Sequence, residues 1–193
     1  MIQDIYPMKL DNAFQMKEPD ADSRILAFRD RTVYLKNEGE ITVLKYHVWV
    51  EYCRMHHKKV PGLVYLFSVD DTSFYLTELY EDVEIPGFRY HKLFALRSMK
   101  PRERVFAATT AWHLYAWYRD NQFCGRCAHS LVHSHTERML QCPVCNNMVF
   151  PKIAPAVIIG LTNNDQIMMT KYADRELSLI HISEPTRPLY ISY

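Results

Sequence analysis

The sequence is short of glycine, of net charge and of long apolar runs. Five glycines occur in 193 residues, with no low-complexity tract and no internal repeat. The 23 lysines and arginines nearly balance 22 aspartates and glutamates, so a formal net charge of +1 does not steer the molecule toward nucleic acid or acidic membranes. No window approaches the roughly 18 apolar residues that a membrane-spanning helix needs. The composition, 48% hydrophobic and 23% charged, is typical of a soluble globular protein.

Cysteine is also scarce outside one cluster. Cys53 is the single cysteine beyond two Cys-x-x-Cys pairs, and it lies in an apolar stretch typical of a core residue. The first residues, Met-Ile-Gln-Asp-Ile, lack the basic segment and apolar run of a secretory signal peptide. Cysteines placed for metal binding in such a chain predict a reducing, cytoplasmic location.

The two cysteine pairs carry the clearest chemical signal. Cys124 and Cys127 form the first pair, and Cys142 and Cys145 form the second after fourteen intervening residues. Each pair can make a tight turn with both sulfurs facing one point, and two such turns supply the tetrahedral thiolate set that zinc prefers. Since four protein ligands leave the ion no open position, the spacing predicts a structural zinc ribbon and not a catalytic metal.

Gly125 and Pro143 suit these turns, because glycine tolerates positive φ and proline presets its own φ. Two disulfides, four unrelated buried thiols, and iron in place of zinc are the alternatives that the sequence leaves open. The histidines between the pairs have no necessary role as ligands once four thiolates are present: His129, His133 and His135. Three basic side chains against one glutamate over residues 123–152 are too few to predict nucleic-acid binding.

Before the ribbon, short strand-like runs alternate with turns. They are rich in β-branched and aromatic residues, which favours a small mixed or antiparallel sheet. The predicted strands are residues 24–29, 32–36, 41–50, 63–69 and 74–79. The acidic pairs at the ends of these runs are expected to be solvated turns, and this part of the chain shows no catalytic constellation.

One long helix is predicted over residues 101–120. Pro101 is well tolerated in a first helical turn, and Ser98 is a candidate cap. One apolar face is formed by side chains three or four residues apart: Val105, Ala108, Trp112 and Tyr115. Core packing explains this stripe better than a stacking box for bases or a cofactor.

The long helix, the ribbon and the segment after it resemble a known family, the zinc-ribbon NADH pyrophosphatases among the Nudix hydrolases. The resemblance is specific over residues 101–172 and looser before them. The segments that carry it, in the family's order, are Phe123-Cys-Gly-Arg-Cys127, Thr136-Glu137, Cys142-Pro-Val-Cys145 and Phe150-Pro-Lys-Ile-Ala-Pro-Ala-Val-Ile-Ile159.

The resemblance implies an enzyme that cleaves the diphosphate of NAD(H) into AMP and nicotinamide mononucleotide. Related members also remove NAD caps from RNA. The family has an N-terminal mixed domain, a zinc ribbon and a Nudix α/β/α sandwich, usually as a homodimer. Its glutamates hold Mg²⁺ or Mn²⁺, which neutralise the diphosphate and help to activate water.

Two residues of this chain match family positions that contact substrate. Phe150 stands five residues after the last cysteine, where the family places an aromatic that is commonly tyrosine, so it keeps the stacking face without the hydroxyl. Arg97 matches an arginine that reaches the active site from the N-terminal domain, although a plain surface arginine is an equal alternative.

The chain departs from the family at the Nudix box, Gly-x5-Glu-x7-Arg-Glu-x-x-Glu-Glu-x-Gly. Its single Arg-Glu after the ribbon is Arg175-Glu176, and Leu179-Ile180 stands where the glutamate pair belongs. No adjacent glutamates occur anywhere in the sequence, and no glycine follows Gly160. No catalytic residue is therefore predicted in this chain.

The predicted class is α+β, with a boundary on each side of the ribbon. Residues 1–122 form an N-terminal mixed α/β domain with a small sheet and one long helix, and residues 123–150 form the zinc ribbon. Residues 151–176 begin an incomplete Nudix sandwich with its first hairpin. Residues 177–193 fit no Nudix element and are expected to be a non-native tail, or else the divergent tail of a short paralogue.

Three hypotheses follow for function. The first is a parent NAD(H) diphosphatase, of which the printed chain is an inactive part. The second is a zinc-ribbon module that binds RNA or a protein without catalysis. The third is a pseudoenzyme that binds NAD(H) weakly through Phe150 and Arg97.

Overall fold

The computed structural model describes residues 5–152, 160–167, 170–171 and 179–180. The chain forms two compact units, Met1–Pro151 and Lys152–Tyr193, which are treated separately below. The predicted boundaries at residues 122 and 176 stay predictions. Among the described residues, none of the helices combines the length and hydrophobicity that crossing a membrane requires.

The first unit contains a five-stranded sheet in the order β1-β7-β8-β2-β6. Neighbouring strands are antiparallel except β2 and β8, which run parallel. The strands are β1 (Leu10–Asp11), β2 (Arg24–Leu26), β6 (Leu44–Lys45), β7 (Val64–Val69) and β8 (Thr72–Leu76). The sheet is therefore mixed.

A second sheet of four strands is organised around β4. β4 pairs with β3 near its start, with β5 at its end, and with β9 along five residues, always antiparallel. The strands are β3 (Phe28–Arg29), β4 (Thr32–Asn37), β5 (Ile41–Thr42) and β9 (Phe88–Lys92). The N-terminal domain thus has two sheets where a single small sheet was predicted.

The strand predicted at 24–29 joins the two sheets. β2 and β3 are separated only by Ala27, so one extended segment passes from the first sheet to the second. Its alternation sends Ile25 and Ala27 to one hydrophobic core and Leu26 and Phe28 to another. Strict period-two burial on both faces means that the segment lies between two covering layers.

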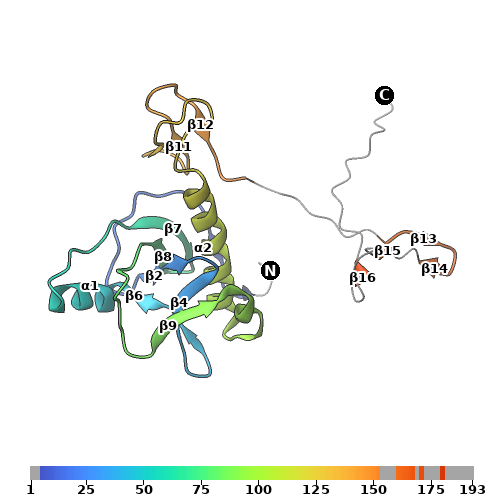
Figure 1. Cartoon of the computed structure of the whole chain (residues 1–193). Helices are drawn as coiled ribbons and strands as arrows, with labels where there is room; N and C mark the ends of the chain where they lie inside the picture. The colour runs from blue at the N-terminus through green and yellow to red at the C-terminus, as the bar shows by residue number, and fades with distance from the viewer. Residues whose placement is uncertain (1–4, 153–159, 168–169, 172–178, 181–193) are drawn as a thin grey trace. The chain divides into compact units, whose positions relative to one another are not determined.

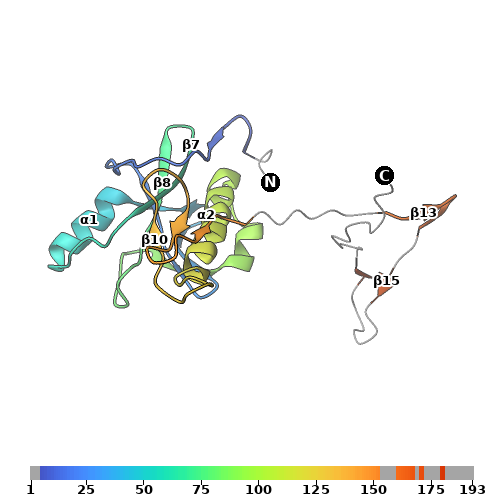
Figure 2. The same cartoon turned by 90° about the horizontal axis from the view of Figure 1, so that it is seen from above.

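Helices α1 (Tyr46–Met55) and α2 (Arg102–Asp120) supply those layers. They lie on opposite sides of the strands in both views (Figures 1 and 2). The predicted strand 41–50 is wrong from Tyr46 onward, where α1 begins. The reason is its apolar period: Trp49, Tyr52 and Cys53 are spaced for one helical face, and all three are buried.

The predicted long helix is confirmed as α2, which follows a 3₁₀ helix, η2 (Leu93–Ser98). The predicted cap is wrong, because the Ser98 hydroxyl donates to the Ala95 carbonyl and Pro101 occupies the cap position without a side-chain bond. The buried face of α2 consists mainly of Ala107, Ala108 and Ala111, and larger side chains flank it.

The second unit is described only in short pieces. β13 (Thr162–Asn163) and β14 (Gln166–Ile167) form a hairpin whose turn includes Asn164 at φ 52°. β15 (Thr170–Lys171) pairs with β16 (Leu179–Ile180). Residues 153–159 of the predicted Nudix segment 151–176, and most of the predicted tail, lie outside the described residues.

Candidate metal centre

The ribbon begins directly after α2 and places its cysteines in two similar turns. β11 (Leu140–Gln141) is the middle strand, between β10 (Val132–His133) and β12 (Met148–Val149). Ala128 N–H donates to the Cys124 carbonyl at 2.8 Å, and Asn146 N–H donates to the Cys142 carbonyl at 3.0 Å. The chain therefore closes each Cys-x-x-Cys turn in the same way.

The residue that closes each turn adopts left-handed backbone geometry. Ala128 has φ 60° and Asn146 has φ 57°. Asparagine tolerates this region through its short polar side chain, whereas alanine does so at some cost. Gly125, expected to supply positive φ, does not have it.

The turns bring all four cysteine sulfurs together. The sulfur atoms of Cys124, Cys127, Cys142 and Cys145 all lie within 4.8 Å of one another. The closest contacts cross between the pairs: 3.3 Å from Cys127 to Cys145, 3.4 Å from Cys127 to Cys142 and 3.5 Å from Cys124 to Cys145. A disulfide needs about 2.05 Å. Tetrahedral Zn–S bonds of about 2.3 Å imply sulfur separations of about 3.8 Å. The cluster therefore fits one metal ion and not two disulfides, and it also rules out four unrelated thiols.

Backbone amides prepare two of these thiols for metal binding. Mainly through the Arg126 N–H, which lies 3.4 Å from its sulfur, the pKa of Cys124 falls from 9.0 to about 6. The Cys145 N–H likewise lowers the pKa of Cys142. Thiolates are the form that binds zinc, so these amides favour the bound state.

Cys127 has the opposite shift. A backbone hydrogen bond from His129 lowers its pKa, but hydrogen bonds with the sulfurs of Cys145 and Cys142 outweigh it and raise the pKa to about 12. Anionic sulfurs this close would repel one another, so Cys127 keeps its proton where no cation is present. A metal ion would displace that proton on binding.

The ribbon histidines lie outside the cysteine cluster. His129 Nδ1 lies 2.9 Å from the Cys127 carbonyl oxygen. His133 stacks on Tyr118 of α2, with ring centroids 4.9 Å apart and planes at 26°. Over the part of the chain that the structure describes, the four cysteines are the single group of metal-ligand type.

Arg138 attaches the ribbon to the N-terminal domain. Its Nη1 donates to Asn12 Oδ1 at 2.6 Å, and its Nη2 donates to the Leu66 carbonyl on β7. Burial lowers the pKa of the Arg138 guanidinium below its ordinary value. Together with the Tyr118–His133 stack, this contact fixes the ribbon against the sheet.

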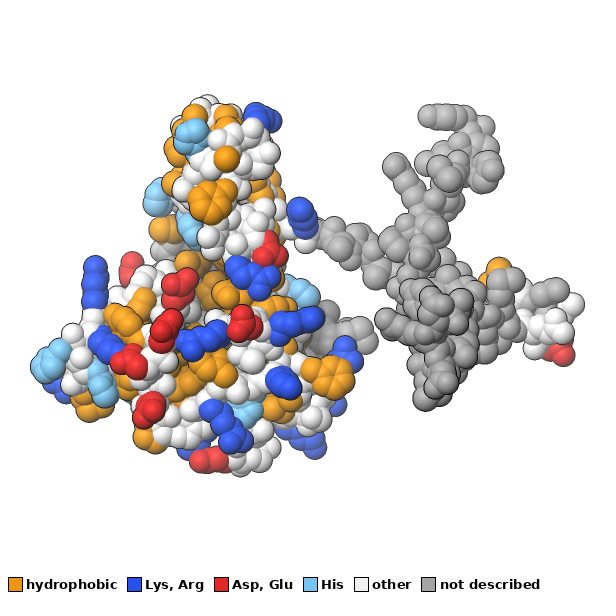
Figure 3. Space-filling model, viewed as in Figure 1, with side chains coloured by type: hydrophobic (Ala, Val, Ile, Leu, Met, Phe, Trp, Pro, Cys, Tyr) orange, Lys and Arg blue, Asp and Glu red, His pale blue; other side chains and the backbone are white. Residues whose placement is uncertain are grey.

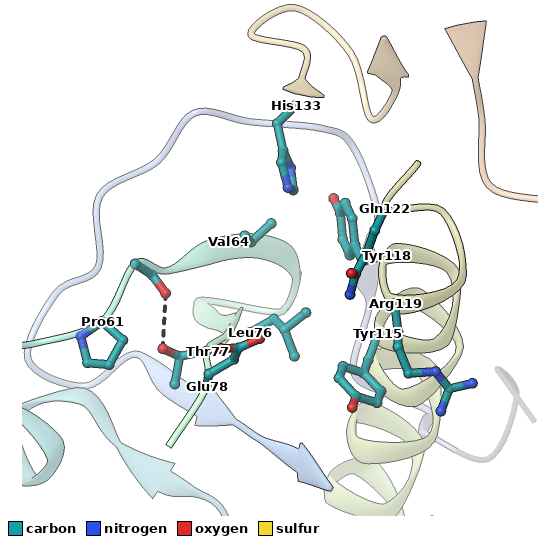
Figure 4. A pocket seen from close by; sticks show the side chains of 11 residues that line it. Pro61, Val64, Leu76, Thr77, Glu78, Tyr115, Tyr118, Arg119, Gln122 and His133 are labelled. Atoms are coloured by element: carbon teal, nitrogen blue, oxygen red, sulfur yellow. Dashed lines mark hydrogen bonds between the residues drawn. The ribbon is translucent and has the colours of Figure 1, made fainter. Parts of the chain in front are cut away.

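A pocket of about 410 Å³ lies where α2, the sheet and the ribbon meet (Figure 4). Val64, Leu76 and Tyr115 give it an apolar floor, and Glu78 and His133 lie on its rim. These residues come from four separate segments. Sequence reasoning missed the pocket because no local pattern joins them.

The two predicted substrate contacts are not brought together in this chain. Phe150 directly follows β12 and is 48% exposed. Arg97 lies in η2, with its guanidinium 5.0 Å from the centroid of the Phe94 ring. Figure 1 places β12 beyond the C-terminal end of α2 and η2 near the N-terminal half of that helix, which is about 28 Å long.

Comparison with known families agrees with this geometry. Residues 119–150 match the family described as the NADH pyrophosphatase zinc ribbon domain. The match covers both cysteine pairs. It confirms the predicted ribbon and its resemblance to NADH pyrophosphatases. The description of the matched family specifies zinc as the metal of the ribbon.

Three curated relatives carry the same description, NAD-capped RNA hydrolase NudC. The chain is 28% identical to the one from Pseudomonas aeruginosa (strain LESB58) over 97 residues, which cover 50% of this chain and 35% of that protein. It is 26% identical to those from Pseudomonas fluorescens (strain Pf0-1), over 103 residues, and Pseudomonas putida (strain ATCC 700007), over 102 residues. Each of these alignments covers 53% of this chain and 37% of the relative. The chain therefore spans about a third of the length of the relatives it matches.

Proposed function

We propose that this chain, which bears a zinc ribbon of the NADH pyrophosphatase type, supplies the N-terminal domain and ribbon of an enzyme that cleaves the diphosphate of NAD(H). The products would be AMP and nicotinamide mononucleotide, and NAD-capped RNA is a further substrate of the same chemistry. The observation that supports this most is the thiol cluster, which lies within the segment matched by the family.

In this proposal the ribbon metal is structural. Four cysteines fill its coordination, so it has no position for water or phosphate. Its function is to hold the turns that place Phe150 at the exit of the ribbon. The exposed Phe150 ring would stack on a planar base of the substrate. Within one chain, Phe150 is the single substrate contact that we propose. Arg97 could reach the same dinucleotide only from a second copy, as a homodimer would allow.

The residues present do not fit the Mg²⁺ or Mn²⁺ site of the family. Its glutamate box is absent from the sequence, and no group of three acidic side chains gathers in the described residues. We therefore derive no hydrolytic step for the printed chain. We expect it to release no AMP from NADH with Mg²⁺.

The test is to read the genomic locus through codon 176 without interruption and to assay the product. The proposal predicts a frame that continues into the missing box, and a product that releases AMP from NADH in a Mg²⁺-dependent reaction. If that product leaves both NADH and NAD-capped RNA intact, the enzymatic proposal is wrong. Light scattering and cell fractionation would test the homodimer and the cytoplasmic location.

The missing box favours a second candidate, a module that binds without catalysis. A pseudoenzyme of this kind would bind NADH through the printed chain, and Phe150→Ala would weaken that binding at least fivefold. Titration calorimetry with NADH decides the point. If the zinc-loaded chain shows no saturable binding heat with NADH, the pseudoenzyme hypothesis is excluded.

A further inference from the structure

A second concave surface lies far from the ribbon, along η2 and the N-terminal half of α2. We call it the α2–η2 groove. It has a volume of about 780 Å³ and is bounded by the turn between β3 and β4, by η2 and by one side of α2. In Figure 3, basic and hydrophobic side chains gather side by side over β9 and η2. The proposed function makes no use of this surface apart from Arg97.

The floor of the groove is apolar and partly open to solvent. Leu93, Phe94, Val105 and Trp112 line it, and the Phe94 side chain is 76% exposed. Phe94 is therefore the part of this floor that is most open to a ligand, and Leu93, Val105 and Trp112 are half-buried beside it. Val105 and Trp112 are seven residues apart on α2, or about 10 Å along its axis. That length matches about two turns of a docked helix.

The rim of the groove is cationic. Arg31, Lys92 and Arg97 line it against one acidic residue, Asp30. None of the three cations has an ion-pair partner among the residues that the structure describes. Arg31 stands about 60 positions before Lys92 and Arg97 in the sequence, so no local run of basic residues marks this rim. Three free cations around an apolar floor complement an anionic ligand that also carries apolar groups.

We propose that the α2–η2 groove binds an acidic amphipathic helix of a partner protein. Apolar anchors spaced i, i+4 and i+7 would enter the floor, and flanking carboxylates would meet the three cations. The floor favours a peptide over single-stranded nucleic acid. Nucleic acid needs several exposed aromatic faces and a row of cations that follows its backbone, whereas this groove has aliphatic walls and one well-exposed ring.

The test uses the zinc-loaded chain and a fluorescein-labelled synthetic helix of about 16 residues, with Leu, Phe and Leu at i, i+4 and i+7 between glutamates. Fluorescence anisotropy should show saturable binding that weakens as salt rises. The triple variant Arg31→Gln/Lys92→Gln/Arg97→Gln and, separately, Phe94→Ala should each weaken binding at least tenfold. Arg126→Gln, an exposed arginine on the ribbon, is the matched control and should change binding less than twofold.

Four further ligands complete the test. A peptide with glutamine in place of glutamate, and one with serine in place of the apolar anchors, should each bind at least tenfold more weakly. The proposal is overturned if the glutamine peptide binds equally well, or if labelled oligouridylate saturates the groove and the acidic helix does not. It is also overturned if NADH displaces the helix, because the groove then belongs to the dinucleotide. Variants count only if they retain zinc and the far-ultraviolet circular dichroism of the parent chain.

Discussion

Arg138 is the residue on which the attachment of the ribbon depends most. Its guanidinium gives up water to donate hydrogen bonds to Asn12 and to the Leu66 carbonyl, while its Nε is buried without a partner in the described residues. A cation held in this way costs desolvation, which two charge-assisted hydrogen bonds offset. The net contribution therefore depends on both partners staying in place.

Replacing Arg138 with glutamine should lower the free energy of unfolding by about 1.5–3 kcal/mol, the range for hydrogen bonds to charged groups. The buried Leu66 carbonyl would lose its cationic donor. Urea unfolding followed by circular dichroism measures the effect. Arg126→Gln removes an exposed arginine from the same ribbon and should cost less than about 0.5 kcal/mol. Equal losses for the two variants would contradict this account of Arg138.

Cys142 is fully buried and belongs to the second turn of the metal cluster. Cys142→Ser replaces a thiolate ligand with a poor one, so the purified chain should retain less than about a tenth of an equivalent of tightly bound zinc. Elemental analysis by mass spectrometry gives the stoichiometry. Cys53→Ala is the control, since Cys53 is equally buried but lies outside the cluster. It should keep about one equivalent, and a full zinc complement in Cys142→Ser would disprove the assignment.

Among the elements, α2 shows how small side chains set a packing distance. Ala107, Ala108 and Ala111 are fully buried against the strands, so the helix backbone approaches the sheet closely. Larger neighbours, such as Trp112 and Tyr115, cover the edges of this contact. Trp112 also lies in the floor of the α2–η2 groove, so α2 contributes side chains both to the hydrophobic core and to the groove.

Enlarging the alanine face should destabilise the fold. Ala108→Leu adds three carbons at a position with no exposed surface and should cost about 1–3 kcal/mol through overpacking. For a chain of this size, that corresponds to a fall in Tm of about 2–4 °C for each kcal/mol. Scanning calorimetry measures the change. His113→Leu, at an exposed position of the same helix, should shift Tm by less than about 2 °C. A larger effect at residue 113 would show that the two faces are misassigned.

At the scale of the whole molecule, the metal should stabilise the ribbon in a pH-dependent way. The pKa of Cys124 is about 6, below its ordinary 9.0, so stability from its thiolate is present above pH 9 and is lost as the pH falls through about 6. The lowered pKa of Cys142 acts in the same direction. Zinc should therefore be retained at pH 7.5 and released progressively below about pH 6, as a chromogenic chelator would report.

Removing zinc with EDTA at pH 7.5 should unfold the ribbon and leave the N-terminal domain folded. The ribbon has short strands and few buried residues of its own, whereas the domain has two hydrophobic clusters. Hydrogen exchange should speed up across residues 123–150 and stay slow in β4, β7 and β8. Fast exchange throughout would mean that the domain also depends on the metal.

The sequence predicted the parts that local pattern controls. Cysteine spacing gave the ribbon, and apolar period gave α2, because each depends on residues near one another in the chain. It failed where local signals compete. Residues 46–50 are β-branched and aromatic enough for a strand, but packing of Trp49 against the strands selects a helix. Gly125 was a plausible residue for positive φ, but Ala128 and Asn146 adopt that geometry where the turns close. Ser98 was a plausible cap for α2, but its hydroxyl donates to the Ala95 carbonyl within η2.

By itself, then, the sequence determined the family of the ribbon, the four metal ligands and the absence of the Nudix box, since each is a matter of residue identity and spacing. Only the tertiary structure decided how Arg138 joins the ribbon to β7, how far apart Phe150 and Arg97 lie, and that Arg31, Lys92 and Arg97 share one groove. Arg138, for example, is separated from its partners Leu66 and Asn12 by 72 and 126 positions in the chain. They depend on the burial of two cores at once, which no local pattern encodes.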